Sequence, residues 1–491
     1  MTRERHVIII GGGLAGLSAG SYLRSSGYRT TVIEHGLSLG GVCNAWQRCG
    51  YTIDGCIQWL TGGAFASIYE ELGIVPRIGL RIIDQFVAYR DLQTHTDLAV
   101  SSNLEATARA LIDVSPGDRA ELERLMDSAR LFASMSPPID PPIELSSLRD
   151  HLGRMWEMRQ GMGALLHFRK PVSVWAEQQL ESALLRRLFC RLFPEETPAL
   201  FLLMVLGYLN KGYLSRPEGG SAAFRDALVS SYEQRGGAVL LNTTVDEILV
   251  SNDTARGVRL ADGEILEADL LISTASAPET VLRLLQGRYG ADELRARMSS
   301  WKLFDPIALV SYGVALPLPD VPHSWILDHI APFEVGGRST DHLLIVTHND
   351  DPALAAPGHS VVQLMLPTNY TWWATRRASY NGEKDALAQR ALRLLDEHLP
   401  GVHAKCEVSD VATPLTFWKS ARSWRGAYEG WAPNSAAFFG HVQKSLPGLG
   451  NFYMAGQWVE PGGGVPTALM SGRQAAQLVC ARDQRPFRTQ A

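Results

Sequence analysis

The most constraining feature of this chain is a glycine-rich turn directly after its first apolar run, VIIIGGGLAG, Val7 to Gly16. The run from Val7 to Ile10 is continuously apolar and β-branched, which is typical of a strand buried on both faces of a parallel sheet. Gly11 permits a tight turn, Gly13 lets the backbone approach a diphosphate, and Gly16 lets the following helix pack against the strand. The N-terminus of that helix faces the phosphates with free N–H groups. The segment therefore predicts a dinucleotide-binding unit.

The next residues complete this unit. Gly27 can end the helix, Thr30 to Ile33 form a second strand, and Glu34 follows it. A carboxylate at this point accepts hydrogen bonds from ribose hydroxyls and would repel the additional phosphate of NADP. Strand, glycines, helix, strand and acidic residue occur in the order and spacing of the fingerprint, which disfavours a glycine turn without a ligand. This unit alone leaves FAD and NAD open.

Two motifs farther along the chain favour FAD. Gly40 and Gly41 form a GG pair shortly after Glu34, and GYTIDGCIQWL follows from Gly50 to Leu60. The acidic residue with its GG pair resembles the two-dinucleotide-binding flavoproteins, in which the N-terminal unit holds FAD. The second motif resembles the GYxFDxG segment of the phytoene desaturase, carotenoid isomerase and retinol saturase family.

The same resemblance reappears, in order, in the middle and at the end of the chain. Residues 217 to 250 resemble the family's PxGG helix and the strand that passes the adenine, with Val245 at the position whose backbone contacts that ring. A hairpin around Asp262-Gly263 and a strand at 269 to 273 should follow. Residues 448 to 473, GLGNFYMAGQWVEPGGGVPTALMSGR, resemble the closing flavin motif, in which a strand delivers AG and a PGGGVP turn begins a helix under the flavin.

The resemblance implies an α/β fold with a Rossmann-type FAD-binding domain, a parallel sheet flanked by helices, and an inserted α+β substrate domain. The cofactor contacts that it implies follow the motifs: Gly11, Gly13, Leu14, Ala15, Gly16, Glu34, His35, Gly40, Gly41, Val42, Val245, Gly456, Gln457, Gly464, Val465 and Pro466.

The length of 491 residues exceeds a single core of about 250 to 300 residues, so at least two domains are expected. Connecting the flavin segments gives a discontinuous FAD-binding domain at 1–90, 215–290 and 408–491. The substrate domain then comprises 91–214 and 293–407. Its first part has a largely helical pattern with a proline-rich break at 136–143, and its second part has strand-like runs at 307–314 and 360–366 before an amphipathic helix at 383–399.

Composition and charge exclude other classes. The hydrophobic content of 46% and charged content of 20% are those of an ordinary globular protein, and a net charge of −5 gives no electrostatic footprint for nucleic acid. The N-terminus shows no cleavable apolar region, so a cytoplasmic location is expected. The six cysteines form no CxxC pair and meet no histidine cluster, so we expect free thiols and no metal. Cys56 could lie near the flavin, although a packing role is favoured.

The longest apolar stretch, ALFLLMVLGYL at 199–209, has two interpretations. Eleven residues are too few to cross a bilayer, so a buried helix is favoured. Alternatively, this stretch and the arginines at 186, 187 and 191 form a peripheral membrane contact for a lipid-soluble substrate.

Candidate catalytic residues are few. Gln58 and Trp59 follow the segment expected near the flavin ring, and Trp458 stands within the closing motif. Indoles offer large apolar area for a flat or polyene substrate or a cation, although most of the tryptophans should be packing residues. Lys419, with Arg422, is a basic candidate in TFWKSARSW, but solvated surface is the commoner role of such residues.

The chain departs from the family at three places. Val42 stands where desaturases frequently have Arg, Gln457 replaces a small or acidic residue, and GCIQWLTGG lacks the usual proline. Gln457 can still hydrogen-bond to flavin hydroxyls or phosphate without supplying charge. These changes leave FAD binding intact but put carotene specificity in question.

These features predict an FAD-dependent oxidoreductase acting on a hydrophobic, conjugated small molecule. Hydride exchange at flavin N5 would desaturate, saturate or isomerise carbon–carbon double bonds. The alternatives are an oxidase or dehydrogenase of a smaller metabolite such as an amine, and a flavin-holding subunit without turnover. No second dinucleotide fingerprint is present, so the electron acceptor would be oxygen, a quinone, a partner, or none for an isomerase.

Overall fold

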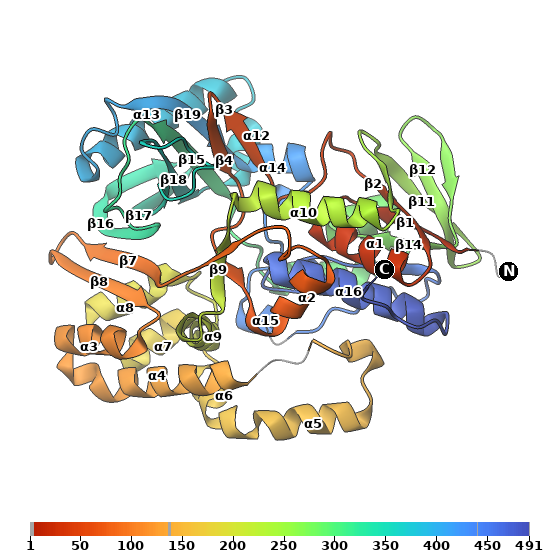
Figure 1. The fold of residues 1–491 in the computed structure, drawn as a ribbon, viewed down its shortest axis with the longest axis horizontal. Coiled ribbons are helices and arrows are strands. Elements are labelled where there is room, and N and C mark those ends of the chain that lie inside the picture. Colours follow the sequence, from red (N-terminus) through yellow and green to blue (C-terminus); the bar gives the residue numbers. More distant parts are fainter. Residues whose placement is uncertain (1–3, 136–138, 439, 491) are drawn as a thin grey trace.

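The computed structural model describes residues 4–135, 139–438 and 440–490. A five-stranded parallel sheet forms one half of the molecule, in the order β10-β2-β1-β14-β20. Its strands are β10 (Ala238–Leu240), β2 (Arg29–Ile33), β1 (His6–Ile10), β14 (Leu270–Ser273) and β20 (Phe452–Met454). Figure 1 shows this sheet at the right, beside both described ends of the chain.

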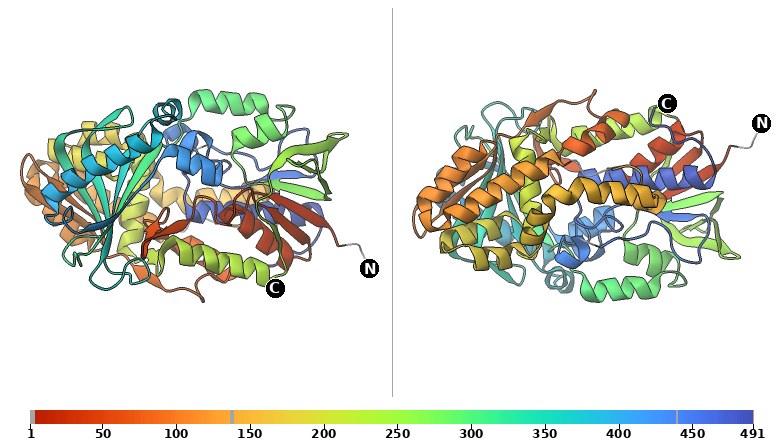
Figure 2. Two further views of the ribbon diagram at one scale, coloured as in Figure 1. Left: turned by 90° about the horizontal axis from the view of Figure 1, so that it is seen from above. Right: turned by 90° about the horizontal axis from the view of Figure 1, so that it is seen from below.

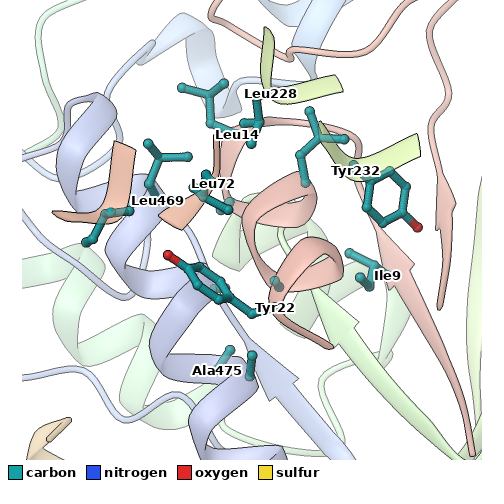
Figure 3. Close-up of a cluster of buried hydrophobic side chains, with 14 of the residues drawn as sticks. Ile9, Leu14, Tyr22, Leu72, Leu228, Tyr232, Leu469 and Ala475 are labelled. Carbon is teal, nitrogen blue, oxygen red and sulfur yellow. The ribbon is translucent and has the colours of Figure 1, made fainter. Parts of the chain in front are cut away.

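Both faces of this sheet are covered, as the apolar first strand predicted. Three helices, α1 (Leu14–Ser25), α10 (Gly220–Gln234) and α16 (Val465–Arg482), pack on one face. Figure 3 shows Ile9 of β1 among side chains of these helices, including Tyr22, Leu228 and Ala475. The alternate residue Ile8 packs on the other face, under a three-stranded antiparallel sheet of β11 (Val245–Ser251), β12 (Thr254–Leu260) and β13 (Ile265–Glu267). The predicted hairpin is the β12–β13 connection.

A seven-stranded sheet forms the other half, in the order β19-β15-β18-β17-β16-β7-β8. Its strands are β19 (Cys406–Ala412), β15 (Ile307–Val314), β18 (Ser360–Pro367), β17 (Arg338–His348), β16 (Ser324–Val335), β7 (Gln85–Asp91) and β8 (Thr96–Ser101). Two of these strands, β7 and β19, run across the predicted domain boundaries at 90 and 408. Because β7 pairs in parallel with β16, a strand more than two hundred residues away, local sequence pattern did not place it in this sheet.

Helices cover the large sheet from two sides. The amphipathic helix expected at 383–399 is α13 (Tyr380–His398), which crosses one face (Figure 2). The helical segment lies on the opposite side in Figure 1, and consists of α3 (Leu104–Val114), α4 (Arg119–Ser134), α5 (Leu148–Met158), α6 (Met162–Phe168), α7 (Val172–Gln179), α8 (Ala183–Leu192) and α9 (Ala199–Asn210). Part of the predicted proline break, 136–138, lies outside the described residues.

Shorter elements connect the halves. Strands β3 (Ala45–Arg48) and β4 (Tyr51–Asp54) form a hairpin, and β5 (Leu60–Thr61), β9 (Leu214–Pro217) and β6 (Leu80–Ile82) form a small sheet. The remaining helices are α2 (Ala66–Glu71), α11 (Ala291–Ser300), α12 (Tyr370–Thr375), α14 (Pro414–Ala421) and α15 (Ser435–Phe438).

The apolar stretch at 199–209 is the buried helix α9. Most of its side chains pack in one core with α4, α8 and the β7–β8 hairpin. Arg187 and Arg191 form ion pairs with Asp328, which is fully buried, and with Asp341. These arginines hold α8 against β16 and β17, so the predicted membrane contact through this stretch is wrong. Among the described residues, no helix is both long enough and apolar enough to cross a membrane.

Candidate active site

The glycine turn follows β1, at the carboxyl end of the parallel sheet. Gly11 has φ +102°, and a Cβ on it would lie 2.6 Å from the hydroxyl of Thr274. A Cβ on Gly16 would lie 2.1 Å from the carbonyl oxygen of Gly11, so this glycine is required for helix packing. Gly13 differs, because within 4 Å its Cβ would meet only the Cα of Gly41, at 3.9 Å. The structure thus leaves the approach to Gly13 open, as a phosphate site requires.

Glu34 lies at the end of β2 and is 5% exposed. Its two carboxylate oxygens accept hydrogen bonds from the backbone N–H groups of Gly12 (2.8 Å) and Gly36 (2.7 Å). Burial raises the pKa of this carboxyl, but hydrogen bonds from His35 and the two backbone groups outweigh burial and leave the pKa below its ordinary value. Oε1 also lies 2.8 Å from Nδ1 of His35, whereas Oε2 has only the hydrogen bond from Gly12, so Oε2 can still accept a hydrogen bond from a ribose hydroxyl.

A second helix N-terminus faces the same space. Helix α16 begins after Gly464, which has φ +93°, and no side chain caps its first N–H groups. Helix α1 likewise begins after Gly13 without a side-chain cap and without an acidic residue in its first turn. Unsatisfied N–H groups and the positive dipole end favour an anionic or electron-rich ligand at both places.

The two helix starts line one continuous cavity of about 1600 Å³. A ligand pocket usually has about 300–1,000 Å³, so this cavity has room for a dinucleotide and a substrate together. All the predicted cofactor contacts line it except Gly16, whose role is packing. Gln58, Trp59 and Trp458 also line the cavity. Lys419 does not: its side chain is exposed, and its carbonyl oxygen lies 3.2 Å from Nε2 of His35.

Residues 56–58 form part of the cavity wall, and their position is fixed by Asp54, a buried residue that the site prediction did not include. Its carboxylate accepts hydrogen bonds from the backbone N–H and hydroxyl of Ser221 (both 2.6 Å) and from the N–H of Cys56 (3.0 Å). These bonds join β4 to the start of α10 and hold residues 56–58 against the cavity. Oε1 of Gln58 is buried there without a hydrogen-bond partner among the described residues, which suits a group that contacts a ligand.

The far end of the cavity is lined by aromatic rings from segments distant in sequence. Trp59 packs edge-on against Phe86 of β7, with 5.8 Å between ring centroids. Phe86 is 6.2 Å from Phe193, which follows α8, and Phe193 is 5.0 Å from Phe201 of α9. All four rings line the cavity, together with Met204, Ile326, Leu344 and Met365. We call these four rings the aromatic row; only Trp59 was expected, because the other three lie outside any motif.

Glu429 is a further cavity residue that sequence reasoning missed. A Cβ on Gly463 would lie 2.6 Å from Cβ and 3.1 Å from Oε2 of Glu429, so the carboxyl lies on the Gly462–Gly464 turn. Burial raises the pKa of this carboxyl to about 7. A single acidic residue within the aromatic segment AYEGW was the one sequence signal available.

Comparison with known proteins identifies the family. The family model of the flavin containing amine oxidoreductases matches residues 14–480. The chain belongs to this family. It is 27% identical to a phytoene desaturase (neurosporene-forming) of Cereibacter sphaeroides, over 96% of this chain and 94% of the relative. It is 24% identical to prolycopene isomerase 2 of an Oncidium hybrid cultivar, over 97% of this chain and 84% of the relative.

A solved structure shows the same fold in a more distant sequence. An oxidoreductase from Methanosarcina mazei aligns with a TM-score of 0.65 at 18% identity, over 96% of this chain and 100% of that one. The family is a flavin family, and two uncapped helix starts with the open approach at Gly13 fit FAD. The protein is an FAD-dependent oxidoreductase, as the sequence motifs predicted.

Proposed function

We propose that this flavoenzyme desaturates a long, conjugated hydrocarbon chain. The observation that carries the proposal is the aromatic row, which continues the cavity beyond the predicted flavin contacts. Flat rings and aliphatic side chains supply apolar area without a charge that a polyene would have to desolvate. The relatives named phytoene desaturase and prolycopene isomerase act on such chains, which supports the same substrate class here.

The residues of the cofactor end would position FAD for this reaction. Glu34 would bind the ribose, the N-termini of α1 and α16 would contact the diphosphate and the ring end, and Val245 would contact the adenine. When bound, FAD supplies hydride acceptance at N5. The chain's own contribution is to orient a substrate C–H bond and to exclude water between Trp59, Gln58 and the closing turn.

Anaerobic spectra test the proposal. We expect the flavin absorbance of the holoenzyme to bleach when a linear polyene with saturated bonds is added, and to stay oxidised with small amines. Bleaching by an amine but not by any polyene would overturn the proposal and favour an amine oxidase. Product formation only after the flavin has been reduced beforehand, without use of an acceptor, would show an isomerase instead.

We also propose that the substrate reaches the enzyme at a membrane surface through α5. Leu148, Leu152 and Trp156 lie one turn apart on this helix and are 81%, 60% and 66% exposed. Arg149, Arg154 and Arg159 belong to the same segment, and apolar residues with basic neighbours are typical of interfacial helices. In Figure 1 this helix lies at the lower edge of the molecule. A quinone dissolved in that membrane, or oxygen, would then reoxidise the flavin.

Vesicle flotation tests the membrane contact. The wild-type protein should float with anionic vesicles, and L148S/L152S/W156S should remain in the soluble fraction. The control L240S/L241S/I265S removes other exposed apolar side chains and should float like the wild type. Equal flotation of all three proteins would exclude α5 as the contact. Stopped-flow reoxidation by a quinone or by oxygen then identifies the acceptor.

A further inference from the structure

The desaturation proposed above requires a group that accepts a proton, and most cavity carboxylates are already engaged. Glu34 accepts backbone hydrogen bonds, and Asp84 is exposed. Others have ion pairs with arginine or lysine, namely Glu195, Glu196, Glu279, Asp305, Asp341 and Asp350. Among the described residues lining the cavity, Glu429 alone is a shielded carboxyl without an ion pair or hydrogen bond.

Glu429 also has the right position. Its carboxyl lies on the turn that begins α16, where a Cβ on Gly463 would be 3.1 Å from Oε2. The carboxyl is also close enough to the thiol of Cys56 and to the neighbouring phenol of Tyr428 to interact with both electrostatically. The motifs of Cys56 and Gly463 are the two that the sequence resemblance assigns to the flavin ring. Glu429 is therefore near both segments that the resemblance assigns to the flavin ring.

The surroundings of Glu429 keep its proton exchangeable near neutrality. The titratable groups that interact with it are Cys56 and Tyr428. A hydrogen bond with Cys43 and burial raise the pKa of Cys56, and burial raises the pKa of Tyr428, so both are uncharged near neutral pH. No cation of the described residues stabilises the Glu429 carboxylate, and burial raises its pKa to about 7. A group with such a pKa can both take and release a proton at physiological pH.

We propose that Glu429 is the proton acceptor of the desaturation. One hydrogen leaves the substrate as hydride, with its bonding pair, to the oxidised flavin. The hydrogen on the adjacent carbon leaves as a proton to the Glu429 carboxylate, and the electron pair of that second C–H bond forms the new double bond. The substrate loses two electrons, the flavin gains them, and Glu429 later releases its proton to water. This inference rests on the proposed function.

Anaerobic single-turnover bleaching with the polyene tests this role. In the wild type, the rate of flavin reduction should rise with pH through about 7, because the carboxylate is the active form. E429Q should bleach about 100- to 10,000-fold more slowly and lose this pH dependence, with FAD content unchanged. E429D should recover part of the rate. The control D385N alters an exposed carboxylate on α13 and should match the wild type.

A measurement without turnover makes the test independent of substrate. Infrared difference spectra of the holoenzyme between acid and alkaline pH should show a protonated carboxyl that titrates near neutrality, absent in E429Q and present in D385N. A missing band, or E429Q bleaching within about 3-fold of the wild type with the same pH profile, would overturn the role of Glu429 alone. If no polyene bleaches the wild type, the proposed function fails and this inference fails with it.

Discussion

The two ends of the cavity are built in different ways. The cofactor end is made largely of backbone: glycines at turns, two uncapped helix starts, and one carboxylate held by N–H groups. The substrate end is made of side chains from β7, the segment after α8, and α9, held together by sheet pairing and ion pairs. The first end depends on local geometry, whereas the second depends on long-range packing. A substitution at one end of the cavity should therefore leave binding at the other end measurable.

The largest expected effect is on the substrate end, at Asp328. This carboxylate is fully buried and accepts hydrogen bonds from Tyr89 and Arg187 at 2.6 to 2.7 Å. Asp328→Ala leaves buried donors without a partner, so it should lower the free energy of unfolding by about 3–5 kcal/mol. Thermal unfolding followed by circular dichroism measures this loss. The exposed change D385N is the control, and an unchanged midpoint in Asp328→Ala would show that the ion pairs do not hold α8 against β16 and β17.

Asp328 also shows what could not be predicted from sequence. The glycine turn, Glu34, and the closing motif are contiguous patterns, so the sheet strands at 7–10, 30–33 and 269–273 and the start of α16 were all predicted within a few residues. Strand β16, which carries Asp328, has partners at residues 85–91 and 338–348, and only the fold brings them together. Phe86, Phe193 and Phe201 of the aromatic row and Glu429 were missed for the same reason. Lys419 was proposed from charge alone, and charge does not tell whether a side chain faces a cavity.

The next prediction concerns the cofactor end. Gly13 has φ −74°, which any residue can adopt, and open space in front of its Cα. Gly13→Val should therefore fold but obstruct the diphosphate, weakening FAD binding by at least about 100-fold, or about 2.7 kcal/mol. Fluorescence titration of apoprotein with FAD measures the change, and the far-ultraviolet spectrum should stay unchanged. Gly382→Ala, on α13 with nothing within 4 Å, is the matched control. Equal FAD affinity in Gly13→Val would contradict the position of the diphosphate.

A smaller effect is expected at the junction of the two ends. Trp59 packs on Phe86 and begins the aromatic row. Trp59→Ala removes apolar contact to the substrate, and we expect KM for a polyene to rise about 5- to 30-fold, corresponding to about 1–2 kcal/mol, with FAD affinity unchanged. Steady-state kinetics and FAD titration on the same preparation separate these effects. A loss of FAD affinity equal to the change in KM would show that the two ends are not independent.

The smallest effect should come from pH at the ribose position. Nδ1 of His35 lies 2.8 Å from the carboxylate of Glu34, and this hydrogen bond raises the pKa of His35 although burial opposes it. Because the folded-state pKa is raised, the stabilisation is fully present below the ordinary value near 6.5 and is lost as pH rises through the raised pKa. The free energy of unfolding should fall by about 1 kcal/mol or less over that range, since the pair is partly solvated. His35→Asn should have a free energy of unfolding that does not change there, as denaturant titrations across the same pH range would show. A steep dependence that persists in His35→Asn would place the titrating group elsewhere, with Glu429 at the ring end as the next residue to examine.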